Sequence, residues 1–182
     1  MGQESPEIWT IGHSTLSIEE FIALLKTQNI GALADVRRFP GSRRHPQFGQ
    51  QPLSESLSGA GIEYVHLPEL GGRRLARPDS PNTAWRNEAF RGYADYMATE
   101  PFRAGMKCLL TLARKQCTAI MCAEALWWRC HRSLISDYLK ADGWKVLHIL
   151  ANKKIEEHPF SSAARILEGK LSYGTSQAEL ML

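Results

Sequence analysis

Residues 7–36 read EIWTIGHSTLSIEEFIALLKTQNIGALADV, and this stretch decides the fold class. The apolar segment Glu7–Ile11 predicts a first strand. Ser17 followed by Glu20 has the spacing of a capping box, so a helix is expected to begin there. Ala32–Val36 then predicts a second strand. Two strands joined through a helix in this way form a parallel pair with a right-handed crossover.

The rest of the chain continues this alternation, interrupted by two polar loops at Arg37–Pro52 and Gly71–Thr83. The expected elements are, in chain order, a short helix at Leu53–Ala60, a strand at Ile62–Leu67, helices at Asn87–Ala98 and Phe102–Lys115, a strand at Thr118–Cys122, a helix at Trp128–Ala141 and a strand at Lys145–Leu150. The alternation predicts an α/β fold, a single three-layer domain with a mainly parallel sheet of about five strands.

We interpret residues 1–182 as a single domain with its core at about residues 7–150. A chain of 182 residues with 43% hydrophobic and 23% charged residues suits one soluble domain with a hydrophobic core. Residues 151–182 are more polar and are interpreted as a C-terminal extension. One helix is expected there, near Ser161–Glu168, before the end frays.

Charge and cysteine content exclude some classes of protein. The net charge of +3 is mild, and no apolar stretch approaches the length of a membrane span. Four cysteines in a chain of this length do not make a disulfide framework, and no basic-then-apolar leader opens the sequence. We therefore expect a cytoplasmic protein with no membrane partner. The oligomeric state is left open by the sequence.

Polar residues follow the predicted strands at the points where the strands end. They are Gly12-His13-Ser14 after the first strand, Asp35 with Arg37 and Arg38 after the second, Pro68-Glu69 after the strand at Ile62–Leu67, and Cys122-Ala123-Glu124 after the strand at Thr118–Cys122. Parallel strands bring these ends to one edge of the sheet, which is where open α/β folds bind ligands. The sequence therefore predicts a site at this edge.

The densest group of reactive side chains lies in residues 121–132, MCAEALWWRCHR. This segment holds two thiols, a carboxylate, an imidazole and two guanidiniums. Core packing has no need of such groups together, so the segment is the best candidate for one wall of the site.

Several blocks of the chain, in order, resemble the domain-of-unknown-function family 488 (DUF488). They are Thr10-Ile11-Gly12-His13-Ser14, then Asp35-Val36-Arg37 with Pro40 and Ser42, and then Cys122-Ala123-Glu124 followed by Cys130-His131-Arg132. The resemblance covers about Trp9–Leu150. It implies an α/β fold and a common site, and it implies no reaction because the family name carries none.

The candidate catalytic residues are Cys122, Glu124, His13, His131 and Asp35. A thiol at a strand end, facing a helix N-terminus with arginines near, has a lowered pKa and acts as a nucleophile. A buried structural cysteine is the alternative for Cys122. Glu124 is a general base or an arginine's partner. Asp35 is either catalytic or a partner of Arg37 or His13. His13 and His131 are candidates for proton transfer.

The candidate substrate-binding residues are Gly12, Ser14, Arg37, Arg38, Ser42, Arg129 and Arg132. Paired arginines on loops favour phosphate or carboxylate ligands, so the expected partner is an anionic, phosphate-bearing ligand. Arg129 lies seven positions after Cys122, one more than the thiol-phosphatase loop requires. That loop is therefore not the interpretation we favour.

We expect an enzyme that acts on a phosphate-bearing, nucleotide-like or nucleic-acid substrate at this edge. A non-catalytic nucleic-acid-binding module is one alternative, using the arginines and Trp127-Trp128. A thiol-based redox or metal sensor built on Cys122 and Cys130 is another. The spacing from Cys122 to Cys130-His131 lacks the tight ligand pairs of structural zinc sites, so we assign no metal and no cofactor.

Overall fold

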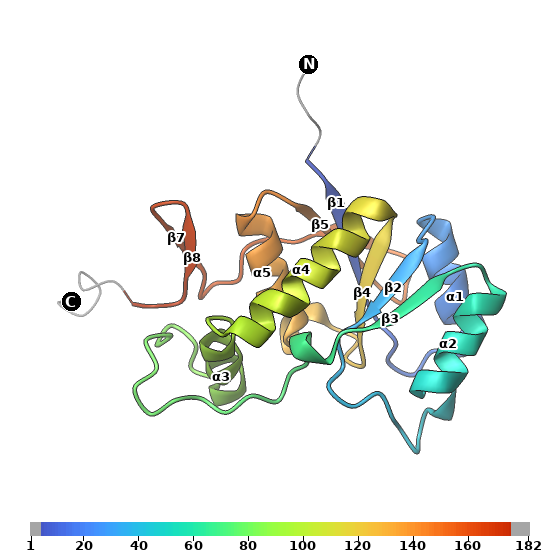
Figure 1. Ribbon diagram of the computed structural model, residues 1–182, viewed down its shortest axis with the longest axis horizontal. Helices are drawn as coiled ribbons and strands as arrows, with labels where there is room; N and C mark the ends of the chain where they lie inside the picture. Colours follow the sequence, from blue (N-terminus) through green and yellow to red (C-terminus); the bar gives the residue numbers. More distant parts are fainter. Residues whose placement is uncertain (1–4, 176–182) are drawn as a thin grey trace.

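A mixed sheet of six strands lies at the centre of the computed structural model, which describes residues 5–175 (Figure 1). The strands are β1 (Glu7–Gly12), β2 (Ala32–Asp35), β3 (Glu63–His66), β4 (Thr118–Cys122), β5 (Lys145–Ile149) and β6 (Ile155–Glu157), in the spatial order β3-β2-β4-β1-β5-β6. The first five are parallel, and β6 runs antiparallel to β5. The expected α/β fold with a mainly parallel sheet is confirmed.

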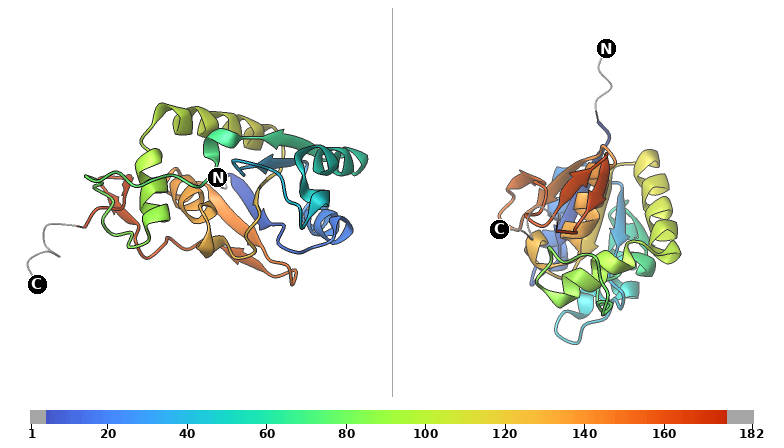
Figure 2. Two further views of the ribbon diagram at one scale, coloured as in Figure 1. Left: turned by 90° about the horizontal axis from the view of Figure 1, so that it is seen from below. Right: turned by 90° about the vertical axis from the view of Figure 1, so that its left-hand side faces the viewer.

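Helices cover both faces of the sheet, as the two views in Figure 2 also show. They are α1 (Ile18–Thr27), α2 (Gln50–Gly59), α3 (Glu88–Tyr96), α4 (Glu100–Lys115) and α5 (Arg132–Ala141). The first two helices share one apolar core with the sheet, and the other three share a second core on the opposite face. The structure thus has three layers. Within residues 5–175, no helix is long and apolar enough to cross a membrane.

The start of α1 follows the expected capping box. The backbone N–H of Glu20 donates to the Ser17 hydroxyl at 3.1 Å, and the backbone N–H of Ser17 donates to the Glu20 carboxylate at 2.8 Å. The helix then buries Phe21, Leu24 and Leu25. Each such burial contributes about 1.5–3 kcal/mol to the free energy of unfolding. Local capping and the apolar face therefore agree on this helix.

The expected helix at Ser161–Glu168 is wrong. That part of the chain ends in a hairpin of β7 (Arg165–Leu167) and β8 (Lys170–Ser172). Glu168 and Gly169, the two residues between these strands, have φ values of 50° and 77°. Positive φ at both central residues is the geometry of the turn that joins tightly paired antiparallel strands, and it stops a helix.

The helix expected at Trp128–Ala141 begins later than the sequence suggests. A separate 3₁₀ turn spans Trp127–Arg129, and α5 starts at Arg132. The turn buries Trp127, whose ring stacks on His148 at a centroid distance of 4.4 Å. One tryptophan of the pair thus fills the core, while Trp128 remains exposed.

The strand order places the polar strand ends together. In the register of the central strands, Gly12 of β1 lies opposite Cys122 of β4. Asp35 of β2 lies opposite Met121 on the other side of β4. Beyond the strands, the backbone N–H of His13 still donates to the Cys122 carbonyl at 3.0 Å. Three loops therefore start from adjacent strands at the carboxyl edge of the sheet.

Candidate functional site

A cavity of about 610 Å³ opens at this edge, and we call it the sheet-edge cavity. It is lined by residues of the loops that follow β1, β2 and β4, together with Gly72 and Arg73. The expected site residues that line it are His13, Ser14, Arg37, Arg38, Ser42, Cys122, Glu124 and His131. Gly12, Asp35, Arg129 and Arg132 are absent from its lining.

Two cysteines meet at the inner end of this cavity. The sulfur of Cys122, at the end of β4, lies 3.1 Å from the sulfur of Cys130, just before α5. The side chains are nearly closed off from solvent, with exposed fractions of 2% and 7%, yet both line the cavity. We call them the sulfur pair. The sulfur pair thus lies where the core meets the cavity wall.

A buried guanidinium lies against the sulfur pair. Arg132, only 1% exposed, donates its Nε–H toward Cys122 at 3.0 Å and toward Cys130 at 3.3 Å. Its Nη1 donates to the Thr10 hydroxyl at 3.2 Å, and its Nη2 donates to the Glu124 backbone carbonyl. A guanidinium stays charged even when buried, so it favours a negative charge on the sulfurs.

The pKa values of the two thiols are shifted in opposite directions. Burial acts to raise the pKa of Cys130, but the hydrogen bond from Cys122 and the charge of Arg132 together hold that pKa well below the ordinary thiol value. Burial and the same hydrogen bond raise the pKa of Cys122 well above it. The favoured state therefore has a thiol at Cys122 that donates to a thiolate at Cys130.

His131 lies next to the sulfur pair in the chain and lines the cavity. Its Nε2 donates to the Val36 carbonyl at 2.9 Å, which leaves Nδ1 as an acceptor. Burial lowers the pKa of His131, so the ring is neutral at neutral pH. A neutral imidazole with one bare nitrogen can accept a proton in a reaction at the cavity.

His13 is held on both nitrogens. Its Nδ1 donates to the Ser14 carbonyl at 3.0 Å, and its Nε2 accepts from Arg37 Nη1 at 3.4 Å. The ring also stacks on Phe48 at a centroid distance of 4.2 Å. Burial, with the neighbouring Arg37 charge, lowers the pKa of His13 to about 4. Its contacts favour a neutral ring that helps to orient Arg37.

Asp35 is fully buried and accepts four hydrogen bonds. Arg37 supplies three of them, through its backbone N–H, through Nε at 2.8 Å and through Nη2 at 2.6 Å. The Tyr64 hydroxyl supplies the fourth at 2.7 Å. These contacts favour Asp35 as the partner that aims Arg37, and a catalytic role for it stays a prediction.

The rim of the cavity is built from exposed and half-buried loop residues. Arg38 donates to the Arg73 carbonyl at 3.2 Å, which links two rim loops. The Ser42 hydroxyl accepts the backbone N–H groups of Arg44 and His45, so it shapes the turn of its loop. Ser42 still lines the cavity, and its expected role in binding stays a prediction.

Gly12, a candidate substrate-binding residue, lies close to the loop after β4 and to Arg132. A Cβ added at Gly12 would lie 2.7 Å from the carbonyl carbon of Glu124 and 2.9 Å from Nη2 of Arg132. Ordinary contacts of a Cβ begin near 3.4 Å. Gly12 therefore lets the loop after β4 cross over β1, which brings the Glu124 carbonyl to Arg132.

Two of the arginines expected to bind the substrate, Arg129 and Arg132, do not line the cavity. Arg129 is exposed and outside the cavity lining, and Arg132 faces the sulfur pair and the loop carbonyls. The sequence interpretation also left Cys130, Arg73 and His45 out of the proposed site, although all three line the cavity. The arginine pair after Gly71-Gly72 was the available signal for Arg73. No sequence signal fixed the approach of Cys130 to Cys122.

A metal centre finds no support in the described part of the chain. Residues 5–175 contain no group of three or more His, Cys, Asp or Glu side chains arranged to hold a metal ion. The chemistry that the arrangement offers is that of a thiolate, a neutral imidazole and cationic side chains around one cavity.

Comparison with protein families gives one match. The family model described as "Domain of unknown function DUF488" matches residues 17–139. The matched range contains the loop with Arg37 and Arg38, both members of the sulfur pair, His131 and Arg132, whereas Gly12 and His13 precede it. Neither the curated proteins nor the solved structures yielded a match.

Proposed function

Because the chain belongs to the DUF488 family, whose description names no activity, we propose a function from the site itself: a cysteine-dependent enzyme that acts on a phosphate-bearing, nucleotide-like or nucleic-acid substrate. One observation carries the proposal. The sulfurs of Cys122 and Cys130 lie 3.1 Å apart, both accept from the buried Arg132, and both line the sheet-edge cavity. Structural cysteines need neither a buried cation nor access to a cavity.

An anionic substrate is supported by the charges around the cavity. Arg37, Arg38 and Arg73 line it, against the single carboxylate of Glu124 among its lining residues. The Arg37 charge is balanced by Asp35, so the rim arginines Arg38 and Arg73 are the candidates for direct contact with an anion. Guanidinium groups bind phosphate through paired hydrogen bonds, which favours a phosphate-bearing ligand.

Cys130 is the proposed nucleophile, and Cys122 is the thiol that stabilises it. In such a reaction the Cys130 sulfur bonds to the electrophilic atom, and the leaving group departs with its electron pair. His131 and Glu124, both in the cavity wall, are the candidates for moving protons to the leaving group and from the water that later restores the thiolate.

Alkylation tests this proposal without knowledge of the substrate. Iodoacetamide is reacted with the intact protein at a series of pH values, and mass spectrometry measures the modification at each cysteine. Cys130 should react faster than the exposed Cys108 at pH 6, because the thiolate is the reactive form. Adenosine monophosphate or a single-stranded oligonucleotide should slow the reaction at Cys130 and leave Cys108 unaffected. Cys108 is thus the internal control.

The outcomes separate the alternatives. If Cys130 reacts no faster than Cys108 at any pH of the series, Cys130 is not the nucleophile. Oligonucleotide binding that weakens with salt, combined with an unreactive Cys130, would favour a non-catalytic nucleic-acid-binding module. Fast alkylation that no phosphate compound slows would refute the proposed substrate class.

The contact between the sulfurs also favours a second candidate function, thiol-based redox sensing. Hydrogen peroxide would oxidise both thiols to a disulfide between Cys122 and Cys130, with two molecules of water as the other product. Mass spectrometry of the peroxide-treated protein should show a loss of two hydrogens, reversed by dithiothreitol. If a Cys122→Ser variant loses the same mass, the disulfide lies elsewhere and this candidate fails.

A further inference from the structure

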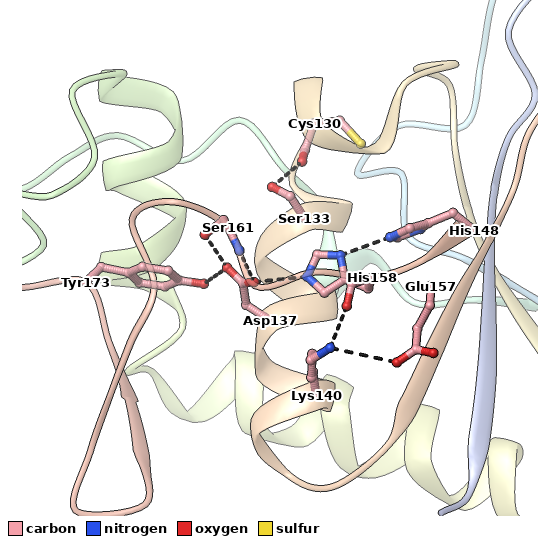
Figure 3. A network of polar contacts seen from close by, with 9 residues as sticks. All are labelled: Cys130, Ser133, Asp137, Lys140, His148, Glu157, His158, Ser161 and Tyr173. Carbon is pink, nitrogen blue, oxygen red and sulfur yellow. Dashed lines mark hydrogen bonds and ion pairs between the residues drawn. The ribbon is translucent and has the colours of Figure 1, made fainter. Parts of the chain in front are cut away.

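A buried carboxylate that the proposed reaction does not use lies deep in the fold. Asp137 of α5 is fully buried and accepts four hydrogen bonds, which Figure 3 shows. One oxygen accepts from Nε2 of His158 and from the backbone N–H of Ser161, each at 2.9 Å. The other accepts from the hydroxyl of Ser161 at 2.6 Å and from that of Tyr173 at 2.8 Å. Asp137 therefore gathers a histidine, a serine and a tyrosine around one buried carboxylate.

From Asp137, a chain of hydrogen bonds runs through two buried histidines. Nδ1 of His158 lies 2.9 Å from Nε2 of His148, and Nδ1 of His148 lies 2.6 Å from the hydroxyl of Thr10. The same Thr10 oxygen accepts from Nη1 of Arg132, whose Nε reaches both members of the sulfur pair. The chain thus links Asp137 to the sulfurs through side chains of β1, β5 and α5 and through His158, the residue that follows β6.

One direction of donation satisfies every link of this chain. We take Asp137 as an acceptor and His158 as a neutral ring, which puts the His158 proton on Nε2 and leaves Nδ1 bare. His148 must then donate from Nε2, and its bare Nδ1 accepts the Thr10 hydroxyl. Arg132 can only donate, and Thr10 has a lone pair for it. Every donor therefore points from the guanidinium towards the carboxylate, and no link has two donors or two acceptors.

We propose that Thr10, His148, His158 and Asp137 form a positioning relay that holds Arg132 against the sulfur pair. The meaning of the relay rests on the proposed function, in which Cys130 acts as a thiolate. A directional chain of this kind polarises each hydrogen bond in turn, so the whole chain strengthens the hydrogen bond that Arg132 donates to the Thr10 hydroxyl. None of the four relay residues lines the cavity, so each acts on the reaction through Arg132.

The surroundings favour a neutral ring of His148 at the centre of the relay. Trp127 stacks on His148 at 4.4 Å, with the two rings 7° from parallel, and its edge faces His158 at 4.9 Å. Burial, the neighbouring His158 and the Arg132 charge lower the pKa of His148 to about 2. The ring of His148 is therefore neutral at neutral pH.

The anchor of the relay comes from the segment that follows β5. His158, Ser161 and Tyr173 all lie in residues 151–175 and close around Asp137 (Figure 3). The sequence interpretation placed this segment outside the core as an extension. Here it supplies three of the groups that fix the far end of the relay.

The tautomers of the two histidines test the direction of the relay in the unaltered protein. Nitrogen-15 chemical shifts of the imidazole rings distinguish a proton on Nε2 from one on Nδ1. Both His148 and His158 should be neutral with the proton on Nε2. A proton on Nδ1 in either ring would overturn the proposal. This measurement does not depend on the reactivity of Cys130, so it separates failure of the relay from failure of the proposed function.

Variants at Thr10 test whether the relay acts on the thiolate. Thr10→Val keeps the shape of the side chain but removes the link between Arg132 and His148, and Thr10→Ser restores it. From the pH dependence of Cys130 alkylation, Thr10→Val should raise the pKa of Cys130 by about one unit, and Thr10→Ser should leave it near the original value. Ser136→Ala is the matched control, because the buried Ser136 hydroxyl has no hydrogen-bond partner among residues 5–175.

The control also guards against a general loss of stability. An unchanged Cys130 pKa in a folded Thr10→Val protein would refute the relay. If Ser136→Ala raises the pKa of Cys130 by the same amount, the effect is not specific to the hydrogen bonds of the relay, and this outcome also refutes the relay. If Thr10→Val does not fold, the histidine tautomers of the unaltered protein still decide the question.

Discussion

Replacing Arg132 by methionine should lower the free energy of unfolding, and it should do so more at pH 8 than at lower pH. The change keeps much of the length of the buried side chain but removes every hydrogen bond of its guanidinium group. Those bonds join the sulfur pair, the Thr10 hydroxyl and the Glu124 carbonyl to one cation. Breaking a buried ion pair from one side costs about 3–5 kcal/mol. We expect a loss of that size at pH 8.

The pH dependence of this loss follows from the lowered pKa of Cys130. An acid whose pKa is lower in the folded than in the unfolded state stabilises the fold fully above the unfolded value, about 8.5 for a thiol. This stabilisation disappears as the pH falls through the folded pKa. Between pH 8.0 and 6.5, one proton at about 1.36 kcal/mol per pH unit changes the contribution by roughly 2 kcal/mol. The raised pKa of Cys122 acts in the opposite sense, but only near and above pH 8.5.

Urea denaturation under reducing conditions measures the effect at both pH values. The free-energy difference between the original protein and Arg132→Met should narrow by about 2 kcal/mol from pH 8.0 to 6.5. Arg103→Met is the control, because Arg103 is exposed and its guanidinium contacts the exposed Glu100 carboxylate and the Ala98 carbonyl rather than a buried group. Its effect should stay within about 0.5 kcal/mol at both pH values. A difference for Arg132→Met that does not change with pH would refute a thiolate paired with this guanidinium.

Three further predictions concern Gly12, His13 and Tyr64, which lie in or near the loops that form the sheet-edge cavity. Gly12→Ala should lower the free energy of unfolding by about 3 kcal/mol, because the new Cβ collides with the carbonyl of Glu124. Gly59→Ala on α2 should raise it by about 0.5–1 kcal/mol, because nothing lies within 4 Å of the added Cβ. Urea denaturation of both variants checks this contrast. The ring of His13 should titrate in NMR spectra with a midpoint of about 4. Because this pKa is lowered on folding, the neutral ring stabilises the fold above pH 6.5, and this stabilisation is lost as the pH falls towards 4. In His13→Gln the free energy of unfolding should therefore fall less steeply between pH 6.5 and 4. An unchanged slope of this free energy against pH would contradict the neutral ring. Tyr64→Phe should cost about 1 kcal/mol in a thermal or urea transition because a buried carboxylate loses one donor, and a neutral result would show that this hydrogen bond adds nothing.

Local patterns were enough for most of the framework. The spacing of Ser17 and Glu20 fixed the start of α1, and the apolar run at Thr118–Cys122 fixed β4, because both depend on neighbours in the chain. The segment near Ser161–Glu168 was misjudged because its pattern permits a helix, while the positive φ of Glu168 and Gly169 closes a hairpin instead. That choice depends on what the segment packs against, which the local sequence does not contain.

The sequence by itself determined the layered α/β fold and the edge of the sheet that carries the polar residues, because parallel strands must end on the same side. Only the tertiary structure decided what those residues do to one another. It brought the sulfur of Cys130 to Cys122 and turned Arg132 inward to both of them. It also connected Thr10 to Asp137 by hydrogen bonds through the buried side chains of His148 and His158. Protonation and charge depend on distances of about 3 Å between groups far apart in the chain, and only packing sets such distances.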